Sequence, residues 1–465
     1  MKINKLSKIA VFITIALLTN GCINLKPALP KIAPTTPSVI GANGHSPVLT
    51  KLKKQGFEHL FLDEKLIAII NKSLINNNDY KITTLNVVRA KAQFGIQKAE
   101  EMPTINLNTG LNRSYSNQSG AGSEWNIGLA STNYELDLFN KTKNMSEIAW
   151  YSYLSKENEN QAAKISLIAE IANLYLTLGS NIELQNLANL TFSNREAELL
   201  IAKKRYEMGV VSEVELNQEL SSVESARIEV ITYKRLIAQN KNELNQLVGE
   251  SVSNDLLPLG FNTEINDSSI PSAIESKVLL ERPDIIEAEN EIKSANANIG
   301  AARAAFFPSI KLTGSLGRTS SGLSDLFSSN TGVWQFSPQI NIPIFQGGLF
   351  SSLQIAKIDR DIAIEKYKKT IQTGFKEAAN VLMLNDSLSE ELIAQKSLVD
   401  VSKNTQKLAQ IRYRTGRDDY MTLLDSERTL YSAQKDLIVK SVAIQQNKIL
   451  FYKIMGGQWP SNDEI

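Results

Sequence analysis

Cysteine and histidine are almost absent from this 465-residue chain, which holds one cysteine and two histidines. One cysteine excludes an intrachain disulfide, and zinc sites or histidine-based triads normally need more of these residues. Charge is balanced at 50 basic against 49 acidic residues, so nucleic acid is not an expected partner. Long apolar runs are scarce too, and after the N-terminus we expect no membrane-spanning helix. A membrane β-barrel stays possible, because its alternating strands leave hydropathy unremarkable.

The single cysteine, Cys22, directly follows an N-terminal leader sequence. Lys2, Lys5 and Lys8 precede a short apolar run, and small and polar residues lead into Cys22. A charged start followed by a short apolar stretch is typical of a secretory signal. We therefore predict a signal peptide at residues 1–21 and acylation of Cys22. The alternative is a plain signal peptide with an incidental cysteine.

The segment after the cysteine is rich in proline, serine, threonine and glycine. Such a composition favours an extended chain over a folded domain. We interpret residues 22–58 as a lipidated, Pro-rich tether.

Proline is missing from two long stretches, between Pro103 and Pro258 and between Pro343 and Pro460. A proline inside a helix costs about 3 kcal/mol, so these stretches permit very long helices. Their Ala, Leu, Lys, Glu and Gln content agrees. Apolar residues between 165 and 182 follow helical spacing on two adjacent faces, which predicts neighbours on two sides. A two-sided coiled-coil rod is the alternative that these residues leave open.

An ordered set of residues recurs about 205 to 207 positions further on, which indicates a tandem duplication. We divide the chain into a first repeat at residues 59–260, a second repeat at 261–460 and a tail at 461–465. The matching series are Ala92, Gly95, Ala99, Pro103, Ile105 and Leu107 against Ala297, Gly300, Ala304, Pro308, Ile310 and Leu312.

Each repeat reads as helix, strand, turn, strand, very long helix, turn and helix. Apolar and polar residues alternate in the strands, and Ile342 and Ile344 belong to the apolar face of the last one. Strands of about ten residues with this alternation are typical of membrane β-barrels. The expected strands are 104–115, 125–138, 309–318 and 333–344, and residues 117–122 form the first connecting loop. The expected turns between long helices are 207–212 and 414–419.

Four strands per chain are too few for a barrel. Single-chain barrels begin at about eight strands, and a barrel of that size is filled by its own side chains. A conduit built from this chain therefore needs three or more copies.

Several motifs resemble TolC-like outer-membrane efflux proteins, specifically the lipoprotein (NodT) branch that serves resistance–nodulation–division pumps. The motifs are Arg282-Pro283-Asp284, the Ala-rich run that ends at Pro308, and Pro343-Ile344-Phe345-Gln346-Gly347-Gly348. The resemblance implies an α+β membrane protein: a homotrimeric β-barrel in the outer membrane of a Gram-negative bacterium, continued by an α-helical barrel tunnel in the periplasm. It also implies a periplasmic adaptor and an inner-membrane pump as partners.

The same resemblance places the functional residues at the turns between long helices. It assigns contacts at the tip or with the adaptor to Arg205, Tyr206 and Gly209 and, in the second repeat, to Arg412, Tyr413 and Gly416. It assigns the periplasmic aperture to Asp425, Glu215, Arg417 and Asp418. Thr422 stands where some relatives carry an aspartate, and Asp418 replaces a basic residue, which Arg417 is expected to supply.

Pro103 and Pro308 each separate a predicted helix from a predicted strand. We interpret both as junctions between tunnel and barrel, with Ala305 in the periplasm and Leu312 facing lipid. No residue pattern predicts a catalytic site, a metal or a cofactor. The resemblance implies passive export through a channel. The alternative function is a lipid-anchored structural coiled-coil protein that bridges outer membrane and periplasm.

Overall fold

The computed structural model describes residues 24–30, 37, 39–41, 52–54, 56–118, 120–261, 265 and 270–460. The predicted signal peptide, Cys22 and the tail lie outside these residues. The described residues form two compact units. We call them the sheet unit (within 1–33, 86–157 and 287–368) and the tip unit (within 34–85, 158–286 and 369–465).

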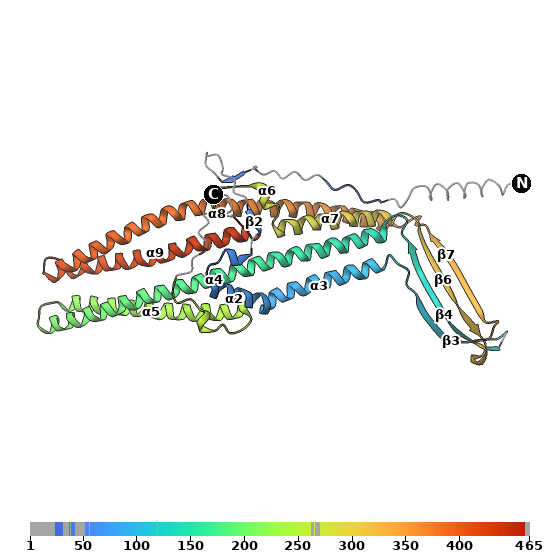
Figure 1. Cartoon of the computed structure of the whole chain (residues 1–465), viewed down its shortest axis with the longest axis horizontal. Coiled ribbons are helices and arrows are strands. Elements are labelled where there is room, and N and C mark those ends of the chain that lie inside the picture. Colours follow the sequence, from blue (N-terminus) through green and yellow to red (C-terminus); the bar gives the residue numbers. More distant parts are fainter. Residues whose placement is uncertain are drawn as a thin grey trace. The chain divides into compact units, whose positions relative to one another are not determined.

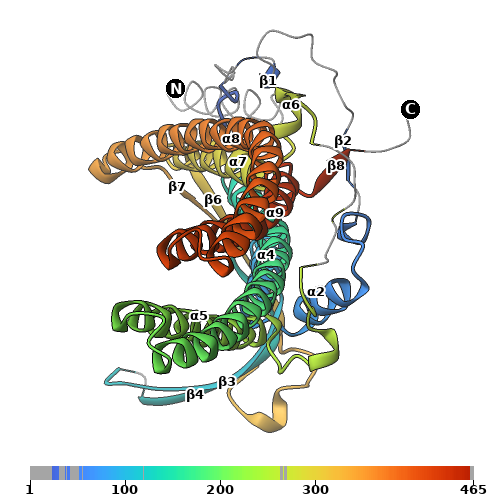
Figure 2. The same ribbon diagram turned by 90° about the vertical axis from the view of Figure 1, so that its left-hand side faces the viewer.

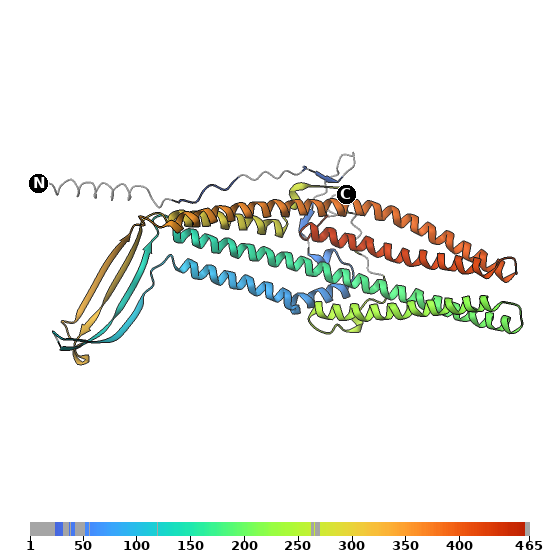
Figure 3. The same ribbon diagram turned by 180° about the vertical axis from the view of Figure 1, so that it is seen from behind.

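Four long helices form two hairpins. Helix α4 (Lys141–Glu207) turns into α5 (Glu213–Val248), and α8 (Gly347–Arg414) turns into α9 (Tyr420–Ile454). The two helices of each hairpin run side by side in Figures 1 and 3. At 1.5 Å per residue, α4 and α8 are each roughly 100 Å long. Such lengths are possible because no proline interrupts either helix.

The expectation that no later helix is apolar enough to span a membrane is wrong for α4. Among the described helices, α4 passes that test by length and composition, and 67% of the apolar window is buried inside the protein. Its middle carries Ile168, Ile171, Tyr175 and Leu178, each at most 1% exposed. The helix is therefore apolar because it forms the core of the tip unit, packed on two sides.

Shorter elements complete the tip unit around this core. Helix α2 (Glu64–Asn76) is hydrogen-bonded to the end of α5. Ser73 Oγ of α2 and Nδ2 of its C-cap residue Asn77 both donate to the Leu247 carbonyl, at 2.6 and 2.8 Å. Figure 2 shows α2 beside the lower half of α4. The remaining elements of the chain are β1 (Val39–Gly41), β2 (Leu52–Lys54), η1 (Phe57–His59), α2 (Glu64–Asn76), α3 (Asn78–Ala99), η2 (Asn254–Leu256), β5 (Ala273–Glu275), α6 (Ser276–Leu279), α7 (Pro283–Ala304), η3 (Leu323–Asp325) and β8 (Gln458–Pro460).

One antiparallel sheet of four strands dominates the sheet unit. Its order is β3 (Asn106–Ser116), β4 (Gly120–Leu136), β6 (Ser309–Ser320) and β7 (Gly332–Asn341). Each repeat supplies one hairpin, and β4 pairs with β6 to join the repeats. Within the described chain, the outer edges of β3 and β7 have no strand partner.

Two details differ from the sequence-based expectation. The last strand ends at Asn341, so Ile342 and Ile344 lie beyond it. Pro343 explains the early end, because proline has no N–H for a ladder hydrogen bond. The first hairpin connection is shorter than expected, since β4 already begins at Gly120 and only residues 117–119 connect the strands.

Each expected junction proline lies between a helix and a strand. Pro103 falls between the end of α3 and the start of β3, and Pro308 falls between α7 and β6. Next to the second junction, the Phe307 ring stacks on Phe139 at a centroid distance of 4.6 Å. This contact joins the end of the first β-hairpin to the start of the second.

The described parts of the predicted tether lie along the folded units. Asn296 Nδ2 donates to the Pro27 carbonyl at 2.8 Å, and Arg303 Nη1 donates to the Leu25 carbonyl at 3.0 Å. In the tip unit, strand β1 pairs with β5. The described parts of residues 22–58 are thus hydrogen-bonded to the folded units.

Candidate functional site

The two turns between long helices have the same backbone construction. Gly209 and Gly416 adopt φ angles of 71° and 68°. In the first turn, Gly209 N donates to the Tyr206 carbonyl and Val210 N donates to the Arg205 carbonyl, both at 2.8 Å. The second turn repeats both bonds at equivalent positions. A left-handed residue closes the helix and satisfies its last carbonyls, which is why glycine stands at both positions.

After each turn, a side chain caps the N-terminus of the next helix. Ser212 Oγ accepts from Glu215 N at 3.2 Å, and Asp419 Oδ1 accepts from Thr422 N at 3.0 Å. Caps of this kind satisfy backbone N–H groups that the first helical turn leaves free. The caps fix the positions of Glu215 and Thr422 relative to the turns.

Tyr413 connects the two hairpin tips. Its hydroxyl donates to Glu215 Oε1 at 2.6 Å, which joins α8 of the second hairpin to α5 of the first. The Arg205 guanidinium lies 5.4 Å from the centre of the Tyr413 ring, and the Tyr420 ring meets it at 5.8 Å. Burial, together with the Glu215 carboxylate, raises the pKa of Tyr413 above its usual range. The hydroxyl therefore stays protonated and donates to the carboxylate.

A second contact is an ion pair within the α8–α9 turn. Arg412 Nε and Nη2 donate to the two carboxylate oxygens of Asp418, at 2.6 and 2.7 Å. The hydrogen bonds from Arg412 lower the pKa of Asp418. Asp418 is thus paired within its own turn. Arg417, the expected substitute for a basic partner, is exposed and forms no ion pair with the described residues.

The structure brings some of the predicted site residues together and leaves others apart. Glu215, Tyr413 and Arg205 form one cluster. Asp425 is exposed on α9 and makes no ion pair within the described chain. Tyr206 is 41% exposed, and its hydroxyl has no hydrogen bond to the described residues. Equivalent residues of the two repeats therefore have different surroundings.

A buried charged cluster above the tips was missed at the sequence level. Arg195, Glu219 and Glu427 lie between the two hairpins, and Arg195 and Glu219 are only 7% and 3% exposed. Burial raises the pKa of Glu219 and of Glu427 to about 7. Spacing carried a signal, because Glu219 shares a helical face with the apolar residues Val223 and Ala226. A carboxylate on an apolar seam predicts burial.

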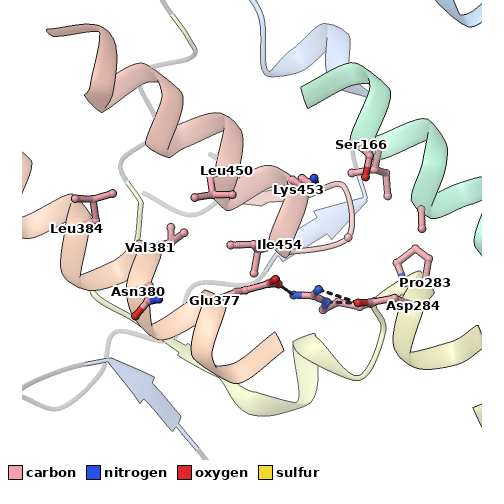
Figure 4. Close-up of a pocket in the computed structure, with 14 residues that line it drawn as sticks. Ser166, Pro283, Asp284, Glu377, Asn380, Val381, Leu384, Leu450, Lys453 and Ile454 are labelled. Atoms are coloured by element: carbon pink, nitrogen blue, oxygen red, sulfur yellow. Dashed lines mark hydrogen bonds and ion pairs between the residues drawn. The ribbon is translucent and has the colours of Figure 1, made fainter. Parts of the chain in front are cut away.

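Arg282 lies beside a cavity of about 440 Å³ in the tip unit, drawn in Figure 4. Arg282 Nε and Nη2 donate to Asp284, and Nη1 donates to Glu377 at 3.0 Å. The guanidinium side chain is 10% exposed, so its charge is compensated by two carboxylates. This arrangement ties the start of α7 to α8, and it is the structural role of the Arg-Pro-Asp motif.

Within the part of the chain that the structure describes, no group of three or more His, Cys, Asp or Glu side chains is arranged to hold a metal ion. The tip residues make a hydrogen bond between helices, from Tyr413 to Glu215, and an ion pair within one turn, between Arg412 and Asp418. Their chemistry is that of joints between helices.

The comparisons with known proteins agree with this geometry. The family model for outer membrane efflux proteins matches residues 69–250 and 275–457, one match in each repeat. The chain is 39% identical over 416 residues to the probable efflux pump outer membrane protein TtgC of Pseudomonas putida, covering 87% of this chain and 86% of TtgC. It is 33% identical to the probable outer membrane lipoprotein SilC of Salmonella typhimurium, covering 94% and 96%.

A solved structure shares the fold. The open state of the MtrE outer membrane channel of Neisseria gonorrhoeae superposes with a TM-score of 0.81 at 31% identity, over 92% of this chain and 98% of MtrE. The chain belongs to the outer membrane efflux protein family.

Proposed function

We propose that this chain is the outer-membrane channel of a tripartite efflux system. It conducts substrates passively to the exterior from a periplasmic adaptor and an inner-membrane resistance–nodulation–division pump. The observation that carries the proposal is one four-stranded antiparallel sheet joined to two long helix hairpins in a member of this family. The matched relatives are named as efflux pump outer membrane proteins and as an outer membrane channel.

The working unit is a homotrimer. The free edges of β3 and β7 each need a strand, because an unpaired edge is not tolerated in lipid. Pairing β7 of one copy with β3 of the next satisfies both edges. Three copies then contribute twelve strands, enough for an open channel, whereas two copies would give a barrel filled by side chains.

The outer face of this barrel contacts lipid. Strand β7 exposes the apolar residues Trp334, Phe336 and Ile340. The polar residues Gln335 and Gln339 lie between them in the sequence. Alternation in a strand places these two sets on opposite faces. The apolar set suits the hydrocarbon and the polar set suits a water-filled lumen. Leu312 of β6 belongs to the lipid-facing set.

The hairpin tips form the closed periplasmic end of the tunnel. The Tyr413–Glu215 and Arg412–Asp418 contacts hold the helices in place, and Asp425 lines the aperture. The turns at Gly209 and Gly416, with Arg205 and Tyr206, contact the adaptor. Three copies of Asp425 would place a ring of carboxylates at the mouth, which favours cations.

Cys22 anchors the chain to the outer membrane by acylation. The order of residues 1–22 supports this, and a matched relative is named as a lipoprotein. Acyl chains contribute about 0.8 kcal/mol per buried CH₂ group, so a multiply acylated cysteine is firmly held. Metabolic labelling with radioactive palmitate should mark the wild type and leave Cys22→Ala unlabelled. Label retained in Cys22→Ala would refute the anchor.

Ion conductance separates the channel from the alternative, a lipid-anchored structural protein. Purified full-length protein in planar lipid bilayers should give discrete single-channel currents and migrate as a heat-sensitive oligomer on gels. The matched control is Asp425→Ala, which should keep the channel and change its ion selectivity. A preparation that inserts and remains electrically silent would refute the channel.

A further inference from the structure

Charged side chains from four helices meet between the two hairpins, above the tips. Arg195 and Glu198 come from α4, Glu219 from α5 and Glu427 from α9. Gln406 of α8 interacts with Glu427 from the fourth side. Arg195 acts electrostatically on all three carboxyl groups, so it lies at the centre of the cluster.

The cluster is buried and poorly compensated. Burial and then the neighbouring Glu198 carboxylate raise the pKa of Glu427. Tyr420 faces Glu219, yet within the described chain neither the Tyr420 hydroxyl nor Glu219 Oε2 completes a hydrogen bond. Three carboxylates around one buried arginine cannot all ionise without net repulsion.

Charged groups face the cluster from all four helices. Helix α4 supplies Arg195 and Glu198, α5 supplies Glu215 and Glu219, α8 supplies Arg414, and α9 supplies Glu427 with the hydroxyls of Tyr420 and Tyr431. Negative groups thus outnumber the two cations once every carboxyl is ionised. Glu427 lies on the second hairpin and Glu198 and Glu219 lie on the first, so repulsion between Glu427 and this pair acts to separate the hairpins.

A cavity lies beside the cluster. Its volume is about 470 Å³, and residues of α4, α8 and α9 line it, among them Glu198, Arg414 and Glu427. Arg195 lines this cavity and a second one of about 200 Å³ on the α5 side. The helices are therefore not tightly packed at this level, and water can enter as the carboxyl groups ionise.

We propose that Arg195, Glu198, Glu219 and Glu427 form a proton-operated clasp between the two hairpins, which holds them together when protonated and loosens when ionised. The opening of the tips, which is the consequence of the clasp, rests on the proposed channel function. Its titration is a property of the chain itself.

The direction of the effect follows from the pKa shifts. Burial raises the pKa of Glu219 and of Glu427 from 4.5 to about 7 in the packed state. The packed state therefore binds each proton up to roughly 300-fold more tightly than a separated state with ordinary carboxyl groups. Stability from the clasp is fully present below pH 4.5 and is lost as pH rises through 7.

Infrared difference spectroscopy tests the titration directly on the full-length protein. Between about pH 5 and 9, the wild type should lose a protonated-carboxyl C=O band with a midpoint near pH 7. The double variant Glu219→Gln/Glu427→Gln should lose most of that band, because Glu198 is the only one of the three carboxyl groups that remains. Glu224→Gln, on the exposed face of α5, is the matched control and should keep it. A wild type with no carboxyl group titrating above pH 6 (about 1.5 above the ordinary value) would overturn the clasp.

Single-channel recording tests the consequence. Open probability should rise with pH across the same range in the wild type and in Glu224→Gln. It should stay at its low-pH level in the double glutamine variant, because neutral side chains keep the hairpins together. Identical pH profiles in the wild type and the double variant would overturn the clasp as an opening device. A protein that never conducts refutes the proposed function, while the infrared titration still decides the clasp.

Discussion

Replacement of Tyr413 by phenylalanine removes one hydroxyl from the joint between the hairpin tips. The ring is retained, so its contacts with Arg205 and Tyr420 persist. The loss is the 2.6 Å hydrogen bond to Glu215. Tyr413→Phe therefore isolates the contribution of one hydrogen bond to the closed tip.

The size of the effect can be worked out from the environment of that bond. A hydrogen bond to a charged group contributes about 1.5–3 kcal/mol when buried. Tyr413 and Glu215 are both half-buried, so the lower end of that range applies. With each chain's tip opening independently, a loss of about 1.5 kcal/mol in a chain raises the open-to-closed ratio of its own tip roughly tenfold.

Single-channel recording at fixed pH and salt measures this ratio. The matched control is Tyr206→Phe, the equivalent residue of the first repeat, whose hydroxyl has no hydrogen bond to the described residues. Tyr413→Phe should open the channel about tenfold more often, and Tyr206→Phe should match the wild type. Equal open probabilities in all three proteins would refute the assignment of Tyr413 as a closing contact.

Three further predictions follow from the fold. Gly416→Ala should lower the free energy of unfolding by about 1–2 kcal/mol in a denaturant titration, because φ is 68° there, whereas Gly347→Ala in open space should have little effect. Arg282→Met should cost about 2 kcal/mol by the same measurement, since Asp284 and Glu377 lose their shared cation; an unchanged midpoint would contradict this. Leu312→Cys should resist a water-soluble maleimide in intact outer membranes, and full labelling would place it in water.

The long helices and the strands were predictable because their signals are local. A very long helix was expected inside the proline-free stretch between Pro103 and Pro258, and α4 spans Lys141–Glu207 within it. A missing proline and a period of two residues are both visible in the sequence without knowing any partner element. Tandem duplication strengthened the prediction, because each repeat provided an independent reading of the same elements.

The charged cluster could not be predicted in the same way. Arg195 and Glu219 lie on the two helices of the first hairpin and Glu427 lies on the second hairpin, far away in sequence, so only the packing of the hairpins completes the cluster. Helical spacing marks Glu219 as buried but does not name its neighbours. The early end of β7 was a different kind of error, since Pro343 itself marked the boundary.

The duplication also explains why the two tips differ. Tyr413 reaches Glu215, but the equivalent pair is Tyr206 and Thr422, and the Thr422 hydroxyl already donates to Asp419 at 2.7 Å. A neutral hydrogen bond contributes about 0.5–1.5 kcal/mol, less than one to a carboxylate. Thr422 therefore cannot offer a tyrosine the carboxylate that Glu215 offers Tyr413, so the joint tested by Tyr413→Phe exists once in each chain, between its own two hairpins.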